Sequence, residues 1–249
     1  MSRINILFLF ILLLNIACKK EKLESQASTI KISTYSDGKE IDINESISLY
    51  SGIPYKITIL KYYISNIRLV NHQGEEISFK MDKENLGADL GVFLFDLGKN
   101  EKITGSLPEN HYTKLKFDLG LNTALNNIDP NPFSALHPLS RDQDMFWDML
   151  KYRFVVMEGL RDTTKMNLYN FPFSYHLGGE EFLRNIVLNI DWNIKSSENS
   201  TLPFRFDLDK IFTDGTDNID ILTFFSYHSI DDQKEIKLKM MDNISNSFE

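Results

Sequence analysis

The chain has 249 residues, of which 42% are hydrophobic and 25% charged, and its formal net charge is −8. This composition is typical of a soluble globular protein, and no cluster of lysine and arginine provides the basic face that binding to nucleic acid requires. The 18 phenylalanines and 10 tyrosines favour strands over helices.

The first 17 residues have the pattern of a secretory signal peptide. Arg3 precedes an apolar run over residues 4–14, and this run is too short to span a bilayer as a helix. We therefore predict that residues 1–17 are a signal peptide and are not part of the folded domain.

The signal ends in Leu14-Asn15-Ile16-Ala17-Cys18, which resembles the lipobox of bacterial lipoproteins, cleaved before the cysteine and acylated on it. Residues 18–28 are then a polar tether, and the protein is held by lipid in the bacterial cell envelope, on the periplasmic side. The alternative is an ordinary signal peptide in which Cys18 is incidental. Because Cys18 is the only cysteine, the mature domain has no disulfides and depends on its core for stability.

Most of the remaining chain is predicted to form strands. In the stretch 55–70 the alternation of apolar and polar residues slips near residues 64–66, which indicates one long strand with a bulge, or two strands. Shorter stretches of the same character are residues 29–35, 41–47, 91–97, 112–121, 152–157, 171–177, 185–194 and 204–208.

Two segments differ from this pattern. Residues 122–144 are a long loop, and loops of that length in a compact domain are usually functional or disordered. Residues 229–248 have helical spacing through Ile236, Met240 and Ile244. Many short strands with one terminal helix predict an all-β fold, an antiparallel β-sandwich over residues 29–249 with a long loop and a short C-terminal helix.

Sequence motifs for catalysis are absent. The chain has no phosphate-binding glycine loop, no Gly-x-Ser-x-Gly elbow, no His-Glu-x-x-His and no Cys-x-x-Cys. We therefore expect a binding protein and not an enzyme.

The five histidines divide into two groups. His72 and His111 lie in predicted turns and are expected to be exposed, whereas His137, His176 and His228 stand in the long loop or at strand ends. Strand ends and loops meet at the poles of a sandwich, so these three side chains could converge, and imidazole binds copper, zinc, iron and nickel. The alternative is that they are three separate polar caps on aromatic strands.

The same residues belong to short motifs that occur in order along the chain. These are residues 60–69, Leu119-Gly120, His137-Pro138-Leu139, Met145-Phe146-Trp147, Glu158-Gly159, His176-Leu177-Gly178, Phe206-Asp207-Leu208, and His228 followed by a helix with Asn243 and Phe248. Together they resemble the MbnP family of bacterial periplasmic copper-binding proteins, including its lipoprotein branch.

The resemblance implies a β-sandwich that holds copper through histidines. The ligands would be His137, His176 and His228, with Met145 or Trp147 close by. In relatives a partner dihaem enzyme oxidises a tryptophan to kynurenine, so Trp147 is the candidate for this modification, and its alternative role is that of a core aromatic.

The chain departs from the family pattern just after Trp147. Met149 stands where relatives often have a second tryptophan, and Lys151 stands where they often have glycine.

Two functions follow as hypotheses. The first is a membrane-anchored periplasmic copper-binding protein for storage, delivery or acquisition of the metal. The second is a metal-free envelope sandwich that binds a protein or glycan partner through Phe171, Phe173 and Tyr175. The positions of the three imidazoles relative to one centre distinguish them.

Overall fold

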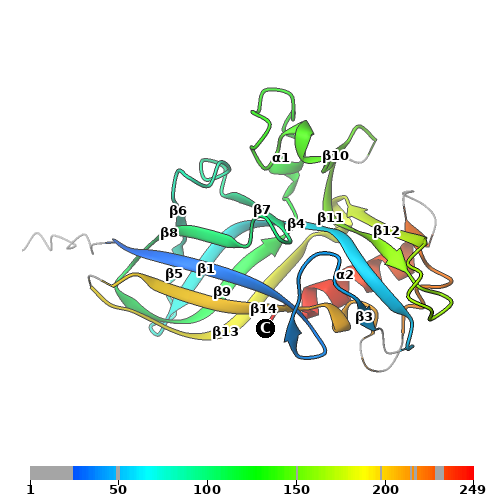
Figure 1. Cartoon of the computed structure of the whole chain (residues 1–249). Helices are drawn as coiled ribbons and strands as arrows, with labels where there is room; N and C mark the ends of the chain where they lie inside the picture. The colour runs from blue at the N-terminus through cyan, green and yellow to red at the C-terminus, as the bar shows by residue number, and fades with distance from the viewer. Residues whose placement is uncertain are drawn as a thin grey trace, which may run out of the picture.

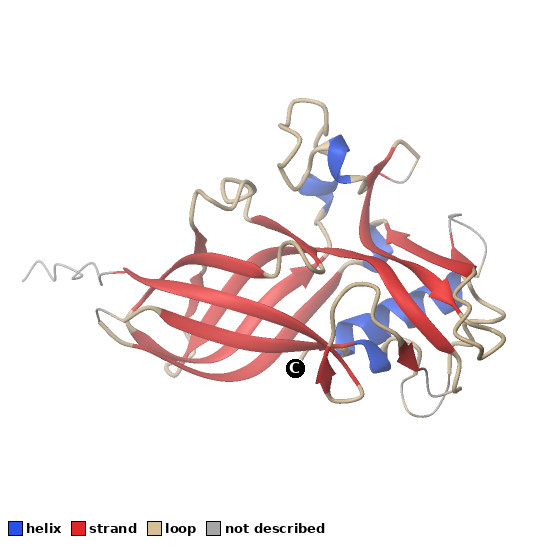
Figure 2. Cartoon of the chain, viewed as in Figure 1, coloured by secondary structure: helices blue, strands red, loops and turns tan. Residues whose placement is uncertain are grey.

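The computed structural model describes residues 25–48, 51–149, 151–196, 198–213, 215, 218–227 and 233–249. Two β-sheets pack into a sandwich, and one longer helix lies near the C-terminus (Figures 1 and 2). The predicted all-β sandwich with a short C-terminal helix is therefore confirmed. Cys18 and His228, two residues with predicted roles, lie outside the described residues.

The smaller sheet is built around the first strand, β1 (Ser25–Ser36). This strand begins within the segment predicted as tether, so residues 25–28 belong to the sheet. Its neighbour β14 (Ser200–Asp207) runs parallel to it through eight residue pairs, an exception in a sandwich that is otherwise mainly antiparallel. The other strands of this sheet are antiparallel, namely β2 (Lys39–Glu40), β6 (Lys80–Met81) and β8 (Lys102–Pro108).

The larger sheet is organised by one strand of 18 residues, β4 (Pro54–Asn71). Short strands pair with it or with its neighbour β11: β3 (Ile47–Ser48), β5 (Glu76–Ser78) and β7 (Val92–Asp96) with β4, and β10 (Phe146–Trp147) with β11. The main strands form a series in which each is hydrogen-bonded to the next: β13 (Arg184–Ile194), β9 (Asn110–Leu119), β4, β11 (Lys151–Arg161), β12 (Phe171–Gly178) and β15 (Ser226–Tyr227).

One edge of β4 is shared by two strands in succession. β7 pairs with Lys61–Ser65 on one side, while on the other side β11 pairs as far as Tyr62 and β9 begins at Ile64. The sheet therefore forks here, and the connection from β9 to β11, residues 120–149, leaves through the fork. We call this connection the long loop; in Figure 1 it stands above the sandwich and carries α1 (Thr123–Asn126).

The bulge predicted in β4 is present. Asn66 has a φ of 54°, in the left-handed region, and the pairing with β9 shifts register between Ser65 and Arg68. The extra residue explains why the apolar alternation of the sequence slips at this point.

Aromatic rings fill the space between the sheets. The ring of Tyr62 on β4 stacks on Phe95 at 4.4 Å, and its other neighbours are Phe206 of β14 at 5.2 Å and Phe248 at 5.6 Å. Phe248 follows the helix α2 (Lys234–Asn246), which buries Met240 and other apolar side chains. The C-terminal end of the chain is thus part of the core.

The remaining helices are single turns: η1 (Arg141–Gln143), η2 (Glu180–Phe182) and η3 (Leu208–Lys210). Within the described part of the chain, no helix has both the length and the apolar character needed to cross a bilayer.

One strand prediction was wrong and one strand was missed. Residues 41–47 form no continuous strand, because Asn44 adopts a left-handed backbone with φ 66° and only the last residue pairs, in β3. β8 was not predicted, because Gly105 interrupts its apolar pattern. A Cβ at Gly105 would lie 2.5 Å from the ring of Phe79, so the glycine makes room for that ring.

Candidate functional site

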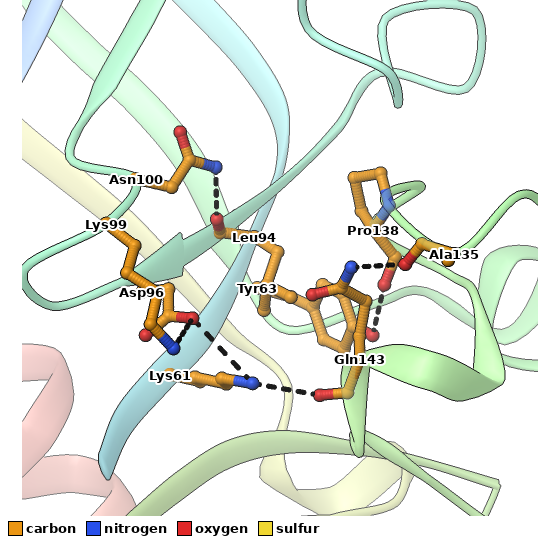
Figure 3. Close-up of polar contacts among 9 residues, drawn as sticks. All are labelled: Lys61, Tyr63, Leu94, Asp96, Lys99, Asn100, Ala135, Pro138 and Gln143. Atoms are coloured by element: carbon orange, nitrogen blue, oxygen red, sulfur yellow. Dashed lines mark hydrogen bonds and ion pairs between the residues drawn. The ribbon is translucent and has the colours of Figure 1, made fainter. Parts of the chain in front are cut away.

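The long loop is fixed to β4 by polar contacts (Figure 3). The hydroxyl of Tyr63 donates to the carbonyl of Pro138 at 2.8 Å, and Lys61 Nζ donates to the carbonyl of Gln143 at 3.0 Å. Lys61 also lies 3.7 Å from the carboxylate of Asp96 on β7. Side chains of the central strand therefore hold the loop that carries His137, Met145 and Trp147.

Tyr152 at the start of β11 holds the loop from its other end. Its hydroxyl donates to the carbonyls of Leu139, at 2.9 Å, and Ile128, at 3.2 Å. Burial raises the pKa of Tyr152 to about 12, so the hydroxyl keeps its proton and stays a donor at neutral pH. These contacts give the loop a defined shape.

His137 is a buried residue within this loop. Its ring stacks on Phe133 with centroids 3.9 Å apart and planes 5° from parallel. Its Nδ1 accepts a hydrogen bond from the backbone N–H of Leu139 at 3.1 Å. Its Nε2 is buried without a hydrogen-bond partner among the described residues and lies 4.0 Å from Asp89 Oδ1. Burial lowers the pKa of His137, so the ring is neutral at pH 7.

This arrangement fixes the tautomer of His137. A neutral imidazole has one N–H, and Nδ1 is an acceptor, so the proton is on Nε2. A metal ion needs the lone pair of Nε2, and binding there would require the Leu139 hydrogen bond to break. The buried Nε2 has no hydrogen-bond partner among the described residues, so it is placed where it could bind a metal ion. In the present tautomer, however, Nε2 carries the proton and has no free lone pair.

His176, on strand β12, has the same tautomer as His137 but different partners. Its Nε2 lies 2.7 Å from Glu158 Oε1 and 3.1 Å from Ser174 Oγ, and its Nδ1 lies 3.2 Å from Arg153 Nη1. Arginine only donates hydrogen bonds, so Nδ1 of His176 is the acceptor. Nε2 therefore carries the proton and donates a hydrogen bond to Glu158. A carboxylate that accepts the second N–H of an imidazole is the usual support for a metal-binding histidine. His176 therefore fits a ligand role through Nδ1.

Trp147 lies beside His176. Both line a cavity of about 240 Å³ together with Phe146 and Arg153. The pairing of β10 with β11 brings Trp147 opposite Lys151 and positions the tryptophan at this cavity. Met145 is fully buried just before β10, and its carbonyl accepts the N–H of Arg153 at 2.7 Å.

The structure brings Trp147 to His176 but gives His137 a separate environment. The partners of His137 come from the long loop and from Asp89, whereas those of His176 come from β11 and β12. Within the residues that the structure describes, no group of three or more His, Cys, Asp or Glu side chains is arranged to hold a metal ion. His228 is not among these residues; it follows Tyr227, which pairs with Tyr175, the residue before His176.

His72 and His111 are exposed, as predicted, but they are not independent. His111 belongs to β9, and its ring stacks on that of His72 with centroids 6.3 Å apart. His111 Nε2 also lies 2.7 Å from Asp191 Oδ1. The two histidines form one surface pair, so a control that removes them must replace both.

The sequence did not identify Glu158 and Arg153 as partners of His176. Both lie on β11, and the register of β11 with β12 pairs Glu158 with Ser174 and Arg153 with Gly178. Only this cross-strand register brings the two charged side chains to the imidazole. The Glu158-Gly159 motif was the one signal in the sequence that included either of them.

The aromatic surface expected for a protein or glycan partner is not formed. Phe171 is 42% exposed, but Phe173 is 2% and Tyr175 0% exposed. β12 turns these two rings toward the core, where they contact each other at 5.6 Å. The second functional hypothesis therefore loses the residues on which it rested.

Comparison with known proteins gives one family and one related structure. A family model described as MbnP matches residues 25–234. The solved structure of MbnP from Methylosinus trichosporium is similar with a TM-score of 0.56 and 15% sequence identity, over 79% of this chain and 80% of that chain. At this identity the likeness is one of fold. Among curated proteins, no sequence matches.

Proposed function

This chain belongs to the MbnP family, and we propose that it is a membrane-anchored periplasmic protein that binds copper through histidines, for storage, delivery or acquisition of the metal. Copper is the cargo of this protein, and imidazole nitrogen is among its preferred ligands. The proposal needs no catalytic base.

The arrangement of His176 is the observation that carries the proposal. The Nε2–H of His176 donates a hydrogen bond to Glu158 Oε1, with 2.7 Å between the two atoms. The Nδ1 lone pair therefore points away from that carboxylate. His176 and Trp147 line the same cavity, and the long loop that supplies Trp147 is held in place by the central strand. A partly buried, oriented imidazole beside a cavity is a suitable first ligand for a copper ion.

We propose His137 and His228 as the other ligands, on the family resemblance. His137 would have to exchange its Leu139 hydrogen bond for the metal. For His228 the support is its sequence position next to Tyr227, whose strand β15 pairs with β12. Trp147 remains the candidate for oxidation to kynurenine by a dihaem partner, and intact-mass measurement of the native protein tests this.

Metal analysis of the full-length protein, purified in detergent at pH 7.5 and loaded with copper, tests the proposal. We expect one tightly held copper ion per chain. Affinity should fall as the pH is lowered through about 6.5, because protonated imidazole has no lone pair to donate. A protein in which His72 and His111 are both replaced by asparagine is the control and should retain the ion. Absence of tightly held copper at pH 7.5 would contradict the proposal.

The membrane anchor is a separate prediction. Wild-type protein should fractionate with membranes, because the several acyl chains on a lipoprotein cysteine give stable anchoring, whereas one chain alone binds only marginally. Cys18→Ala should leave the protein unprocessed or in the soluble fraction. Cell fractionation with immunoblotting measures both, and wild-type protein in the soluble periplasmic fraction would refute the anchor.

A further inference from the structure

We propose that Arg153 is a cationic cap on His176, and that copper binds to His176 only when the guanidinium moves away from Nδ1. This inference rests on the proposed function and specifies how access to the same site is regulated. Arg153 Nη1 lies 3.2 Å from His176 Nδ1, so the arginine occupies the direction in which a metal ion would sit.

The guanidinium of Arg153 and a copper ion on His176 Nδ1 cannot be present at the same time. A first-row metal ion sits roughly 2 Å from an imidazole nitrogen, which is well inside the space that Arg153 Nη1 now fills. The guanidinium keeps its positive charge at physiological pH and has no lone pair to offer a metal. Geometry and charge therefore both prevent a cation from joining His176 while Arg153 stays in place.

The position of Arg153 indicates that the cap can be displaced. Its Nε is buried without a hydrogen-bond partner among the described residues, which is a costly position for a charged group. The backbone of Arg153 is held by Met145, but its side chain lies at the border of the cavity with Phe146 and Trp147. The side chain can move into that space while the strand stays fixed.

Negative charges draw Arg153 to its present place. Glu158, which also holds His176, and Asp144 of the long loop both attract the guanidinium. Glu158 therefore interacts with both His176 and Arg153. It accepts the hydrogen bond from His176 Nε2 at 2.7 Å, and its negative charge attracts the guanidinium of Arg153. When a cation takes the place of the arginine, the carboxylate remains next to the new positive charge.

Removing the charge at position 153 should make copper binding easier. In Arg153→Leu, which removes the charge without adding a thioether that could itself bind copper, we expect the affinity for copper to rise by at least about tenfold. Binding should also become faster, because the wild type must first open the cap. Stopped-flow measurement of copper uptake should show a step in the wild type whose rate does not depend on copper concentration, and Arg153→Leu should lack it.

Arg68→Leu is the matched control. It removes the same charge from β4, where Arg68 pairs with Glu76 at 3.0 Å and not with His176. Its copper affinity should equal that of the wild type. Arg153→Gln is the second neutral variant and replaces Arg153→Leu if thermal unfolding shows that the leucine variant does not fold.

Competition titrations of the full-length proteins with a copper chelator give the decisive result. Tighter binding in the neutral variants, with Arg68→Leu unchanged, supports the cap. Equal or weaker binding in the neutral variants, with one copper still bound by the wild type, overturns the cap and leaves the proposed function intact. If neither the wild type nor the variants bind copper, the proposed function fails, and the cap fails with it.

Discussion

Replacing His176 with alanine should lower the affinity for copper by more than about 100-fold, or about 2.7 kcal/mol. The change removes the Nδ1 lone pair at the cavity, and it also leaves Glu158 without the N–H that it now accepts at 2.7 Å. Titration against a chelator of known copper affinity measures the loss. A loss of this size is expected because removal of groups that only support a ligand already costs about 10–100-fold.

The same measurement on His137→Ala and His228→Ala tests the other proposed ligands. The surface pair His72 and His111, replaced together by asparagine, is the control and should bind copper as the wild type does. If all three single variants bind copper as tightly as the wild type, copper is not held by these histidines and the ligand assignment is wrong.

Replacing Phe248 with alanine should lower the free energy of unfolding by about 3–5 kcal/mol. Phe248 is 5% exposed, and its ring lies 4.9 Å from Phe206, 5.2 Å from Phe117 and 5.6 Å from Tyr62. Its loss would open a cavity between strands of both sheets. Because domains of this kind are stable by only about 5–15 kcal/mol, the change is a large part of the total.

Urea denaturation of the apoprotein, followed by circular dichroism, measures this effect. Phe171→Ala is the matched control, since Phe171 is 42% exposed at the start of β12, and it should cost less than about 1 kcal/mol. Equal effects of the two substitutions would show that the C-terminal end of the chain is not part of the core.

Alternation of apolar residues was sufficient to predict most of the larger sheet. The long strand β4, its bulge at Asn66 and the strands β9, β11, β12 and β13 all follow from side chains that face alternately in and out. The pattern failed where a residue contributes through its backbone or its small size. Asn44 breaks a run of isoleucines by its left-handed backbone, and Gly105 fills an inward position without an apolar side chain.

The site was less predictable than the fold, for a physical reason. The sequence marks histidines because their chemistry is distinctive, but it does not give the register between strands. A different register of β11 with β12 would pair other residues with Ser174 and His176, and Glu158 and Arg153 would then have no contact with the imidazole. Likewise, nothing in the sequence showed that the Nδ1 of His137 would accept the N–H of Leu139.

The parallel pairing of β1 with β14 has a mechanical consequence. β1 lies between β14, through eight residue pairs, and β8, through seven. Tension applied through the residues before Ser25, as by a lipid anchor in a moving membrane, would pull along β1 itself. The hydrogen bonds of β1 to β14 and β8 lie across the direction of the force. They would therefore be loaded in shear and resist together, instead of breaking one after another. An anchor placed before Ser25 would thus pull on a strand that is paired along both edges.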